Sequence, residues 1–297
     1  YHWVAMPLAI HGVVVKTDGT RININIGDKE TDPVFCITDL LPHLGQEQMQ
    51  KNAAKVIEGE SLDLLIGSQP VKGEEKEGVT KFINALLEKE YGFVERDLLS
   101  AELEIVPAGK ARDMGFDRSM IIAYGQDDRV CAYTSLVAML EVDKVKRTTC
   151  CLLVDKEEIG SVGATGMQSR FFENAVAEIL TLMGKPNSVN VRRTLENSRM
   201  LSSDVSAGYD PLYAAAFEKK NASYLGMGVV FNKFTGSRGK AGSNDANAEY
   251  MGFIRRVMEA NNVTYQTAEL GKVDLGGGGT IAYIMALYGM NVIDCGV

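Results

Sequence analysis

The stretch TTCCLLVDKEEIGS, residues 148–161, decides the fold that this sequence predicts. Its first half, residues 148–154, is a continuous, mostly apolar run, which is typical of a strand buried on both faces. Its second half is an acidic turn with a glycine, and helical periodicity then runs over residues 168–183 until Gly184 and Pro186. The stretch therefore predicts a buried strand, an acidic turn and a helix that covers the strand.

The same order recurs in the second part of the chain. Residues 199–203 are a predicted strand that leads into Asp204, and residues 235–244 are a predicted loop of small and polar residues. Further strands are predicted at 228–231 and 291–294, and further helices at 130–140, 246–260 and 280–288. Strands that alternate with helices predict an α/β fold with a mostly parallel sheet flanked by helices, and sites in such folds collect at the carboxyl ends of the strands.

The first part of the chain has a different pattern. Residues 8–16 and 21–26 are the predicted strands of a hairpin, because the Asp-Gly pair at 18–19 favours a tight turn. Helical periodicity predicts helices at 46–58 and 77–91, with a short strand at 62–66 between them. We therefore expect an α+β domain over residues 1–100 and a second domain over residues 101–297.

Composition excludes several classes of protein. The 297 residues carry a net charge of −8 with no basic block, which argues against nucleic acid as a partner. No apolar run reaches the roughly 18 residues that span a bilayer, so no membrane partner is expected. The five cysteines form no C-x-x-C pair and lie mostly in apolar runs, as free thiols do in a reducing compartment. We expect a cytoplasmic protein.

Three acidic clusters each follow a short apolar run: QDDR at 126–129, DKEE at 155–158 and SSD at 202–204. Taken singly they have structural interpretations, since Asp127 or Asp128 suits a helix N-cap and Glu157 and Glu158 suit a first helical turn. Carboxylates gathered at one sheet edge, however, repel one another unless cations lie among them. The combination is what a two-metal hydrolase needs, because oxygen ligands hold the cations and a free carboxylate serves as a base.

Several motifs together resemble one family. They are VFCITDLLPHL (34–44), GQDDRVC (125–131), VDKEEIGS (154–161), SD (203–204), NDA (244–246), GGTI (278–281) and LYGM (287–290). In this order, over nearly the whole chain, they resemble the aspartyl aminopeptidase and aminopeptidase I family of dinuclear zinc exopeptidases. The resemblance implies a zinc-exopeptidase-like catalytic domain at 101–297, into which the α+β domain at 1–100 is inserted as a dimerisation domain.

The resemblance also assigns roles to the acidic residues. Two divalent metal ions, zinc above others, would be bridged by Asp127, with Glu158 on one ion and Asp204 on the other. Glu157 would be the general base in a metallo-aminopeptidase that removes single N-terminal residues from peptides. The family pattern further implies a cis peptide bond after Asp127.

Two further sites follow from the resemblance. A lone histidine beside a proline, such as His43, is usually structural, but the family pattern makes it a substrate-binding residue that reaches into a neighbouring subunit's active site. Gly278 and Gly279 would line the catalytic cleft, where a peptide approaches the backbone closely. Arg238 and Lys240 lie in the preceding loop, either solvated or in contact with an acidic substrate side chain.

The chain departs from the family at the metal centre. The family supplies two histidine ligands, one from an upstream His-x-Asp motif and one from a Met-His motif near the C-terminus, and neither motif occurs here. The only histidines are His2, His11 and His43. We therefore expect a fragment that lacks both termini and that, on its own, binds metal poorly and is inactive.

Two alternatives stay open beside the aminopeptidase. A non-catalytic assembly module on the same scaffold is disfavoured by the presence of both Glu157 and Glu158. A related dinuclear-metal deacylase is disfavoured by the segment around His43. The resemblance implies peptide substrates and a homo-oligomer, namely the family's dodecamer built from dimers.

Overall fold

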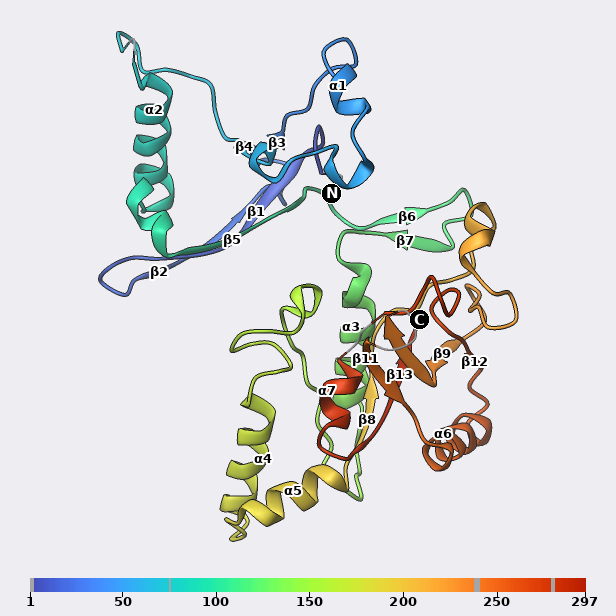
Figure 1. Cartoon of the computed structure of the whole chain (residues 1–297). Coiled ribbons are helices and arrows are strands. Elements are labelled where there is room, and N and C mark those ends of the chain that lie inside the picture. The colour runs from blue at the N-terminus through green and yellow to red at the C-terminus, as the bar shows by residue number, and fades with distance from the viewer. Residues whose placement is uncertain (1–2, 75, 238–240, 279–280) are drawn as a thin grey trace. The chain divides into compact units, whose positions relative to one another are not determined.

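The structure is a computed structural model that describes residues 3–74, 76–237, 241–278 and 281–297 (Figure 1). Helices and several small sheets occur together, so the predicted α/β class is confirmed. The chain divides into two compact units, Tyr1–Tyr124 and Gly125–Val297.

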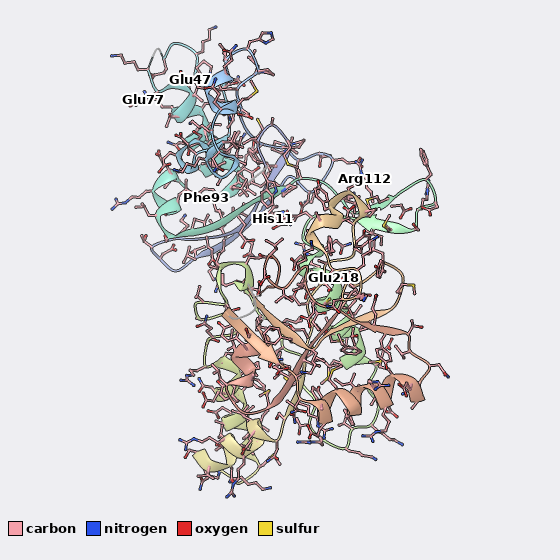
Figure 2. All side chains as sticks on the ribbon, turned by 45° about the vertical axis from the view of Figure 1, so that its right-hand side comes forward. His11, Glu47, Glu77, Phe93, Arg112 and Glu218 are labelled. Atoms are coloured by element: carbon pink, nitrogen blue, oxygen red, sulfur yellow. The ribbon has the colours of Figure 1, made fainter. Side chains whose placement is uncertain are left out.

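The first unit is built on the predicted hairpin. Strands β1 (Leu8–Val15) and β2 (Arg21–Ile26) pair antiparallel, and β5 (Ala101–Pro107) joins the other edge of β1. One face of the sheet is apolar and forms a small core with the ring of Phe93, which Figure 2 labels. Gly12 of β1 lies so close to β5 that a Cβ would lie 1.9 Å from the Glu102 carbonyl oxygen, so only glycine fits there.

Short elements complete the first unit. The helix predicted at 77–91 is confirmed as α2 (Gly78–Leu86) and a π-helical turn, Leu87–Tyr91, and the strand predicted at 62–66 is β4 (Leu64–Leu65), paired with β3 (Cys36–Ile37). The remaining short helices and the β6–β7 hairpin lie at Gln46–Met49 (α1), Ala53–Lys55, Gly59–Ser61, Glu95–Ser100, Arg112–Met114 (β6) and Met120–Ile122 (β7).

The single helix predicted at 46–58 is wrong. After α1 the chain breaks, and the Asn52 side chain accepts a hydrogen bond from the Ala54 backbone N–H at 3.1 Å, which starts a separate 3-10 turn. None of the α1 residues is buried. A helix without an apolar face to bury gains little from packing, so the local cap decides the backbone here.

The second unit contains a four-stranded sheet in the order β12-β9-β13-β8, formed by Tyr265–Thr267, Val229–Asn232, Asn291–Gly296 and Arg199–Ser202. Strands β13 and β8 are parallel, β12 and β9 are parallel, and β13 and β9 are antiparallel. The sheet is therefore mixed within this chain, and a mostly parallel catalytic sheet stays a prediction. The strands predicted at 199–203, 228–231 and 291–294 are confirmed.

Five helices accompany this sheet: α3 (Gln126–Leu140), α4 (Phe171–Leu182), α5 (Ser188–Glu196), α6 (Ala248–Ala260) and α7 (Ala282–Ala286). All but α5 were predicted. Two apolar cores lie in the unit, one between α7, β13 and α5 and the other between α6, β9 and β13. Both share β13, whose Val292 and Ile293 are almost fully buried.

Two predictions for the second unit are wrong. Residues 148–154 form no strand. A strand needs backbone hydrogen bonds to a neighbouring strand, and among the described residues no other strand pairs with this apolar run. Residues 235–237 and 241–244 are not a loop, since β10 (Phe234–Ser237) and β11 (Ala241–Asp245) pair antiparallel, while residues 238–240 of the predicted loop lie outside the described residues. The polar residues of this segment suggested an exposed loop, but the Asn244 side chain is buried and its amide donates a hydrogen bond to the Val292 carbonyl at 2.9 Å.

The compact units do not divide where the domain prediction divides the chain. Strand β5 begins at Ala101 but belongs with the first unit, because it pairs with β1 along its length. The division into an inserted domain at 1–100 and a catalytic domain at 101–297 stays a prediction. As for membrane spans, the described part of the chain contains no helix with the length and apolarity to cross a bilayer.

The α6 core yields a matched prediction. Ile254 is buried in α6 against the β9 and β13 core, whereas Val257, one turn later, is 41% exposed. Ile254→Ala should lower the free energy of unfolding of the second unit by about 2–5 kcal/mol, the usual cost of such a core deletion. Val257→Ala removes a β-branched residue from the same helix and should change the free energy of unfolding by less than about 0.5 kcal/mol. Urea denaturation followed by far-UV circular dichroism measures both, and equal effects would contradict the assigned core.

Candidate metal centre

Three carboxylates of the second unit converge. One carboxylate oxygen from each of Asp127, Asp128 and Asp204 lies within 4.8 Å of the others. The structure thus brings together Asp127 and Asp204, which sequence analysis predicted as ligands. It adds Asp128, which sequence analysis did not select, because an N-cap interpretation of this residue does not reveal that its carboxylate also faces the cluster.

The start of α3 places the first two carboxylates. Gly125 adopts a φ of +72°, and Asp127 and Asp128 have non-helical backbone angles before the regular helix begins. The peptide bond between Asp127 and Asp128 is cis, as the resemblance predicts. The Asp128 carboxylate accepts a hydrogen bond from the Cys131 backbone N–H at 3.3 Å, so Asp128 also caps the regular helix.

The end of β8 places the third carboxylate. Asp204 follows this strand, and its carboxylate accepts a hydrogen bond from the Val205 backbone N–H at 2.8 Å. The neighbouring Ser203 hydroxyl accepts a hydrogen bond at 2.9 Å from Ser135, which lies on α3. The helix that carries Asp127 and the strand end that carries Asp204 are therefore joined directly.

Glu157 lies in the loop that sequence analysis singled out. It begins a 3-10 turn, Glu157–Ile159, inside a loop closed by backbone hydrogen bonds from Asp155 to Thr165 (3.1 Å) and from Ser161 to Lys156 (2.7 Å). Ser161 is buried beneath the loop, and the Gln168 side chain donates to the Gly160 carbonyl at 2.6 Å. These bonds fix the backbone that carries Glu157.

The electrostatics show that the four acidic groups act on one another. Burial, followed by the charges of Asp127, Asp128 and Glu157, raises the pKa of Asp204 to about 7. Burial, followed by the charges of Glu158, Asp127 and Asp128, raises the pKa of Glu157. Burial is also the main cause that raises the pKa of Asp128. Glu157 thus belongs to the same electrostatic cluster as the three aspartates.

The cluster fits a divalent cation. Hard carboxylate oxygens that converge within ligand distance of a common point, and that repel one another in its absence, are stabilised when a cation binds between them. Glu158 is exposed and is not a member of the three-carboxylate group. Its role as a ligand stays a prediction, as do the other assigned site roles.

The predicted substrate-side residues lie in several places. His43 is exposed in a turn before α1, in the first unit. Gly278 lines a pocket with β10 and the segment 269–277, where burial raises the pKa of Glu269. Gly279, Arg238 and Lys240 lie outside the described residues. Sequence analysis missed Glu269 because a single acid after a short strand carries no motif.

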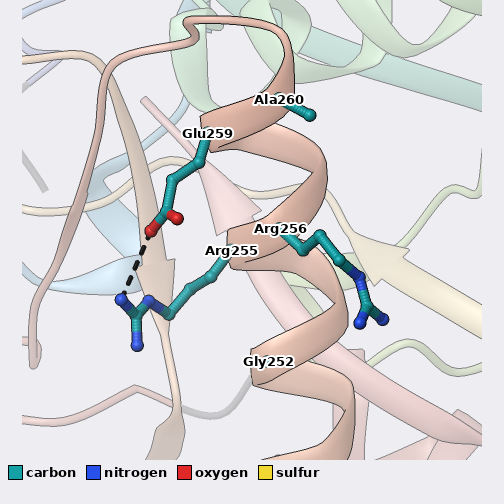
Figure 3. Close-up of a pocket in the computed structure, with 5 residues that line it drawn as sticks. All are labelled: Gly252, Arg255, Arg256, Glu259 and Ala260. Atoms are coloured by element: carbon teal, nitrogen blue, oxygen red, sulfur yellow. Dashed lines mark hydrogen bonds and ion pairs between the residues drawn. The ribbon is translucent and has the colours of Figure 1, made fainter.

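A second, open pocket lies on α6 (Figure 3). Its lining consists of Gly252, Arg255, Arg256, Glu259 and Ala260, and Arg255 pairs with Glu259 at 3.3 Å, one turn away. The paired side chains are each 60% exposed to solvent. None of these residues belongs to the carboxylate cluster, so we place the candidate site at the cluster and not at this pocket.

The raised pKa of Asp204 predicts a pH dependence of stability. Its folded-state pKa of about 7 lies above the ordinary value of 3.8, so the folded state binds the extra proton between these values. Without divalent cations, stability should therefore fall as pH rises from about 4 to about 7. Asp204→Asn keeps an acceptor for the Val205 N–H but cannot ionise. It should raise the free energy of unfolding at pH 8 and flatten this slope, as measured by urea denaturation in chelator, and an unchanged slope would contradict the electrostatic account.

Comparison with known proteins identifies the family of the chain. The whole chain, residues 1–297, matches the family described as aminopeptidase I zinc metalloprotease (M18). It is 61% identical over 298 residues to a probable M18 family aminopeptidase 1 of Clostridium acetobutylicum, all of this chain matching 64% of that protein. The chain therefore spans about 64% of the length of this relative.

Solved structures give the same result. The crystal structure of aminopeptidase I from Clostridium acetobutylicum superposes with a TM-score of 0.91 at 61% identity, over 100% of this chain and 64% of that one. The M18 aminopeptidase from Thermotoga maritima superposes with a TM-score of 0.90 at 46% identity, over 100% and 65%. The S. cerevisiae mApe1 dodecamer, at 17% identity and a TM-score of 0.64 over 99% and 63%, shares the fold. The chain belongs to the M18 family of aminopeptidase I zinc metalloproteases.

Proposed function

We propose that the protein is a zinc-dependent aminopeptidase that removes single N-terminal residues from peptides. The observation that carries the proposal is the convergence of Asp127, Asp128 and Asp204 within 4.8 Å, with Glu157 in the same electrostatic cluster. Membership of the M18 family supports zinc as the metal and disfavours a deacylase. In the proposal Asp127 would hold both of two zinc ions, and Glu158 and Asp204 would each hold one of them.

Zinc and Glu157 have separate roles in the proposed reaction. Zinc, when bound, supplies Lewis-acid polarisation of the scissile carbonyl and lowers the pKa of the attacking water. A Glu157 carboxylate oxygen accepts a proton from that water and later delivers it to the nitrogen of the leaving amine. The raised pKa of Glu157 suits this role, because a base is most effective when its pKa lies near the working pH.

The remaining groups orient the substrate. In the proposal the free α-amine of the peptide binds at the metal centre, which limits cleavage to one residue at a time. The backbone of Gly278 and Gly279 lies along the peptide, and the pocket that Gly278 lines supports this assignment. Peptides are the expected partners, with neither nucleic acid nor membrane required.

The proposed assembly is a homo-oligomer in the cytoplasm. The S. cerevisiae mApe1 of the same fold is a dodecamer, which supports a dodecamer built from dimers here. In this assembly the inserted domain at 1–100 forms the dimer, and His43 contributes to a neighbouring subunit's active site. Its exposure in the first unit is compatible with a contact to another chain.

Replacement of the proposed base tests the mechanism. In the full-length protein, Glu157→Gln should lower kcat for aminoacyl nitroanilides by about 10²–10⁴-fold, the usual contribution of a general base. Zinc content, measured by atomic absorption, should stay unchanged because Glu157 is not a proposed ligand. Glu178→Gln, an exposed change on α4, is the control. A Glu157 variant with normal turnover would contradict the assignment.

Metal removal tests the activity as a whole. The full-length protein should cleave at least one of the Asp-, Glu- and Leu-nitroanilides, and a chelator should abolish this cleavage until zinc is restored. The expectation rests on the convergence of the Asp127, Asp128 and Asp204 carboxylates within 4.8 Å, which fits a divalent cation. Cleavage that survives complete zinc removal, or none with any of the three substrates, would refute the proposed activity.

The proposed role of His43 predicts a separation of effects. His43→Ala should lower turnover in the assembled protein on the order of tenfold, equal to about 1.4 kcal/mol of lost transition-state binding. Zinc content and oligomer size should not change, and Glu47→Ala on the nearby α1 serves as the matched surface control. Loss of zinc from the His43 variant, with catalysis at the remaining sites intact, would exclude the substrate-binding role.

A further inference from the structure

We propose that Gly296 is a positioning residue for the metal centre: its backbone, packed against Asp204 and close to Cys131, sets the position of the Asp204 carboxylate. The inference rests on the proposed function, since it concerns the same cation site. It adds a residue that binds neither metal nor substrate.

The first observation is the absence of space at Gly296, near the end of β13. A Cβ on this residue would lie 1.5 Å from the carbonyl oxygen of Asp204 and 2.6 Å from its carbonyl carbon. Real Cβ atoms do not approach backbone atoms this closely, so a larger residue must move one of the two segments. The segment on the other side of the contact is the backbone of a proposed ligand.

The second observation is that neither segment can easily move. On one side of Asp204, Ser202 pairs with Asp294 in the parallel β8–β13 ladder. On the other side, the Ser206 backbone N–H donates to the Val297 carbonyl at 2.8 Å. The turn at Asp204 is therefore attached to β13 before and after the point where Gly296 touches it.

The third observation is that Cys131 lies close to Gly296. The same Cβ would lie 3.4 Å from the sulfur of Cys131, whose side chain is only 3% exposed. Cys131 lies on α3 and its N–H donates to the Asp128 carboxylate. Gly296 thus packs close both to the backbone of Asp204 and to the residue whose N–H bonds Asp128.

We infer that this packing determines the distance of the Asp204 carboxylate from those of Asp127 and Asp128. Asp204 lies within 4.8 Å of Asp127 and Asp128, and cation affinity depends on that convergence. An added methyl group at Gly296 would overlap the Asp204 carbonyl group and displace the Asp204 backbone, and the Cys131 sulfur, 3.4 Å from the same methyl position, limits the space that remains. Groups that orient metal ligands without binding the metal typically contribute 10–100-fold to affinity.

The test is zinc binding by the full-length protein and its variants, measured by isothermal titration calorimetry. Gly296→Ala should weaken zinc binding about 10–100-fold, the range expected for loss of ligand positioning. Gly12→Ala is the matched control, because its Cβ would lie 1.9 Å from a backbone carbonyl oxygen in the first unit. It should cost stability but leave zinc affinity unchanged. An affinity of Gly296→Ala equal to that of the unmodified protein would overturn the inference.

A double-mutant cycle separates positioning from a general loss of structure. If Gly296 acts through Asp204, Gly296→Ala should change zinc affinity by less than about twofold in an Asp204→Asn background, since the positioned ligand is already lost. An equal loss in both backgrounds would overturn the inference while leaving the proposed function intact. Absence of zinc binding by the unmodified protein would overturn both.

A second variant covers the case in which Gly296→Ala does not fold. Cys131→Val nearly conserves volume, but its second branch adds an atom close to Gly296, whose Cβ position lies 3.4 Å from the Cys131 sulfur. It should weaken zinc binding about tenfold with a normal circular dichroism spectrum, a change of about 1.4 kcal/mol in binding free energy. Unchanged affinity in this folded variant would overturn the packing account.

Discussion

The mutual repulsion of four carboxylates is the constraint on which the second unit depends. Asp127, Asp128 and Asp204 converge within 4.8 Å, and burial, followed by the charges of Asp127, Asp128 and Glu157, raises the pKa of Asp204 to about 7. Such an arrangement costs folding free energy when all groups are ionised, so the surrounding structure must hold it. A bound cation reverses the sign of this interaction, which is why a site that destabilises the cation-free chain suits a metalloenzyme.

The fold meets this constraint by joining three separate segments near one end of β13. The start of α3 carries Asp127 and Asp128, and a hydrogen bond between Ser135 and Ser203 joins that helix to the end of β8. Strand β13 pairs with β8 and supports both apolar cores, while a network of backbone hydrogen bonds holds the loop of Glu157. Stability resides in the cores, and the repulsion of like charges is confined to the start of α3, the segment after β8 and the loop of Glu157.

Much of this arrangement could be predicted from the sequence, and the exceptions have physical reasons. The β1–β2 hairpin, α2, α4, α6 and β13 follow from periodicity and turn chemistry, and the acidic clusters pointed to Asp127 and Asp204. The run at 148–154 has the composition of a strand, but a strand also needs a partner, which composition does not reveal. The pairing of β10 with β11 was not predicted because the buried polar groups of these strands, such as Asn244, form hydrogen bonds to a distant strand. Asp128 was missed because one carboxylate can both cap a helix and face a cation.

The central claim is that these carboxylates bind zinc, and anomalous diffraction at the zinc absorption edge tests it most directly. Crystals of the full-length protein grown with zinc should show anomalous peaks about 2.0–2.2 Å from carboxylate oxygens of Asp127 and Asp204, the usual zinc–oxygen distance. Peaks confined to other positions, such as the cysteines or His11 and His43, with none between Asp127 and Asp204, would contradict the account.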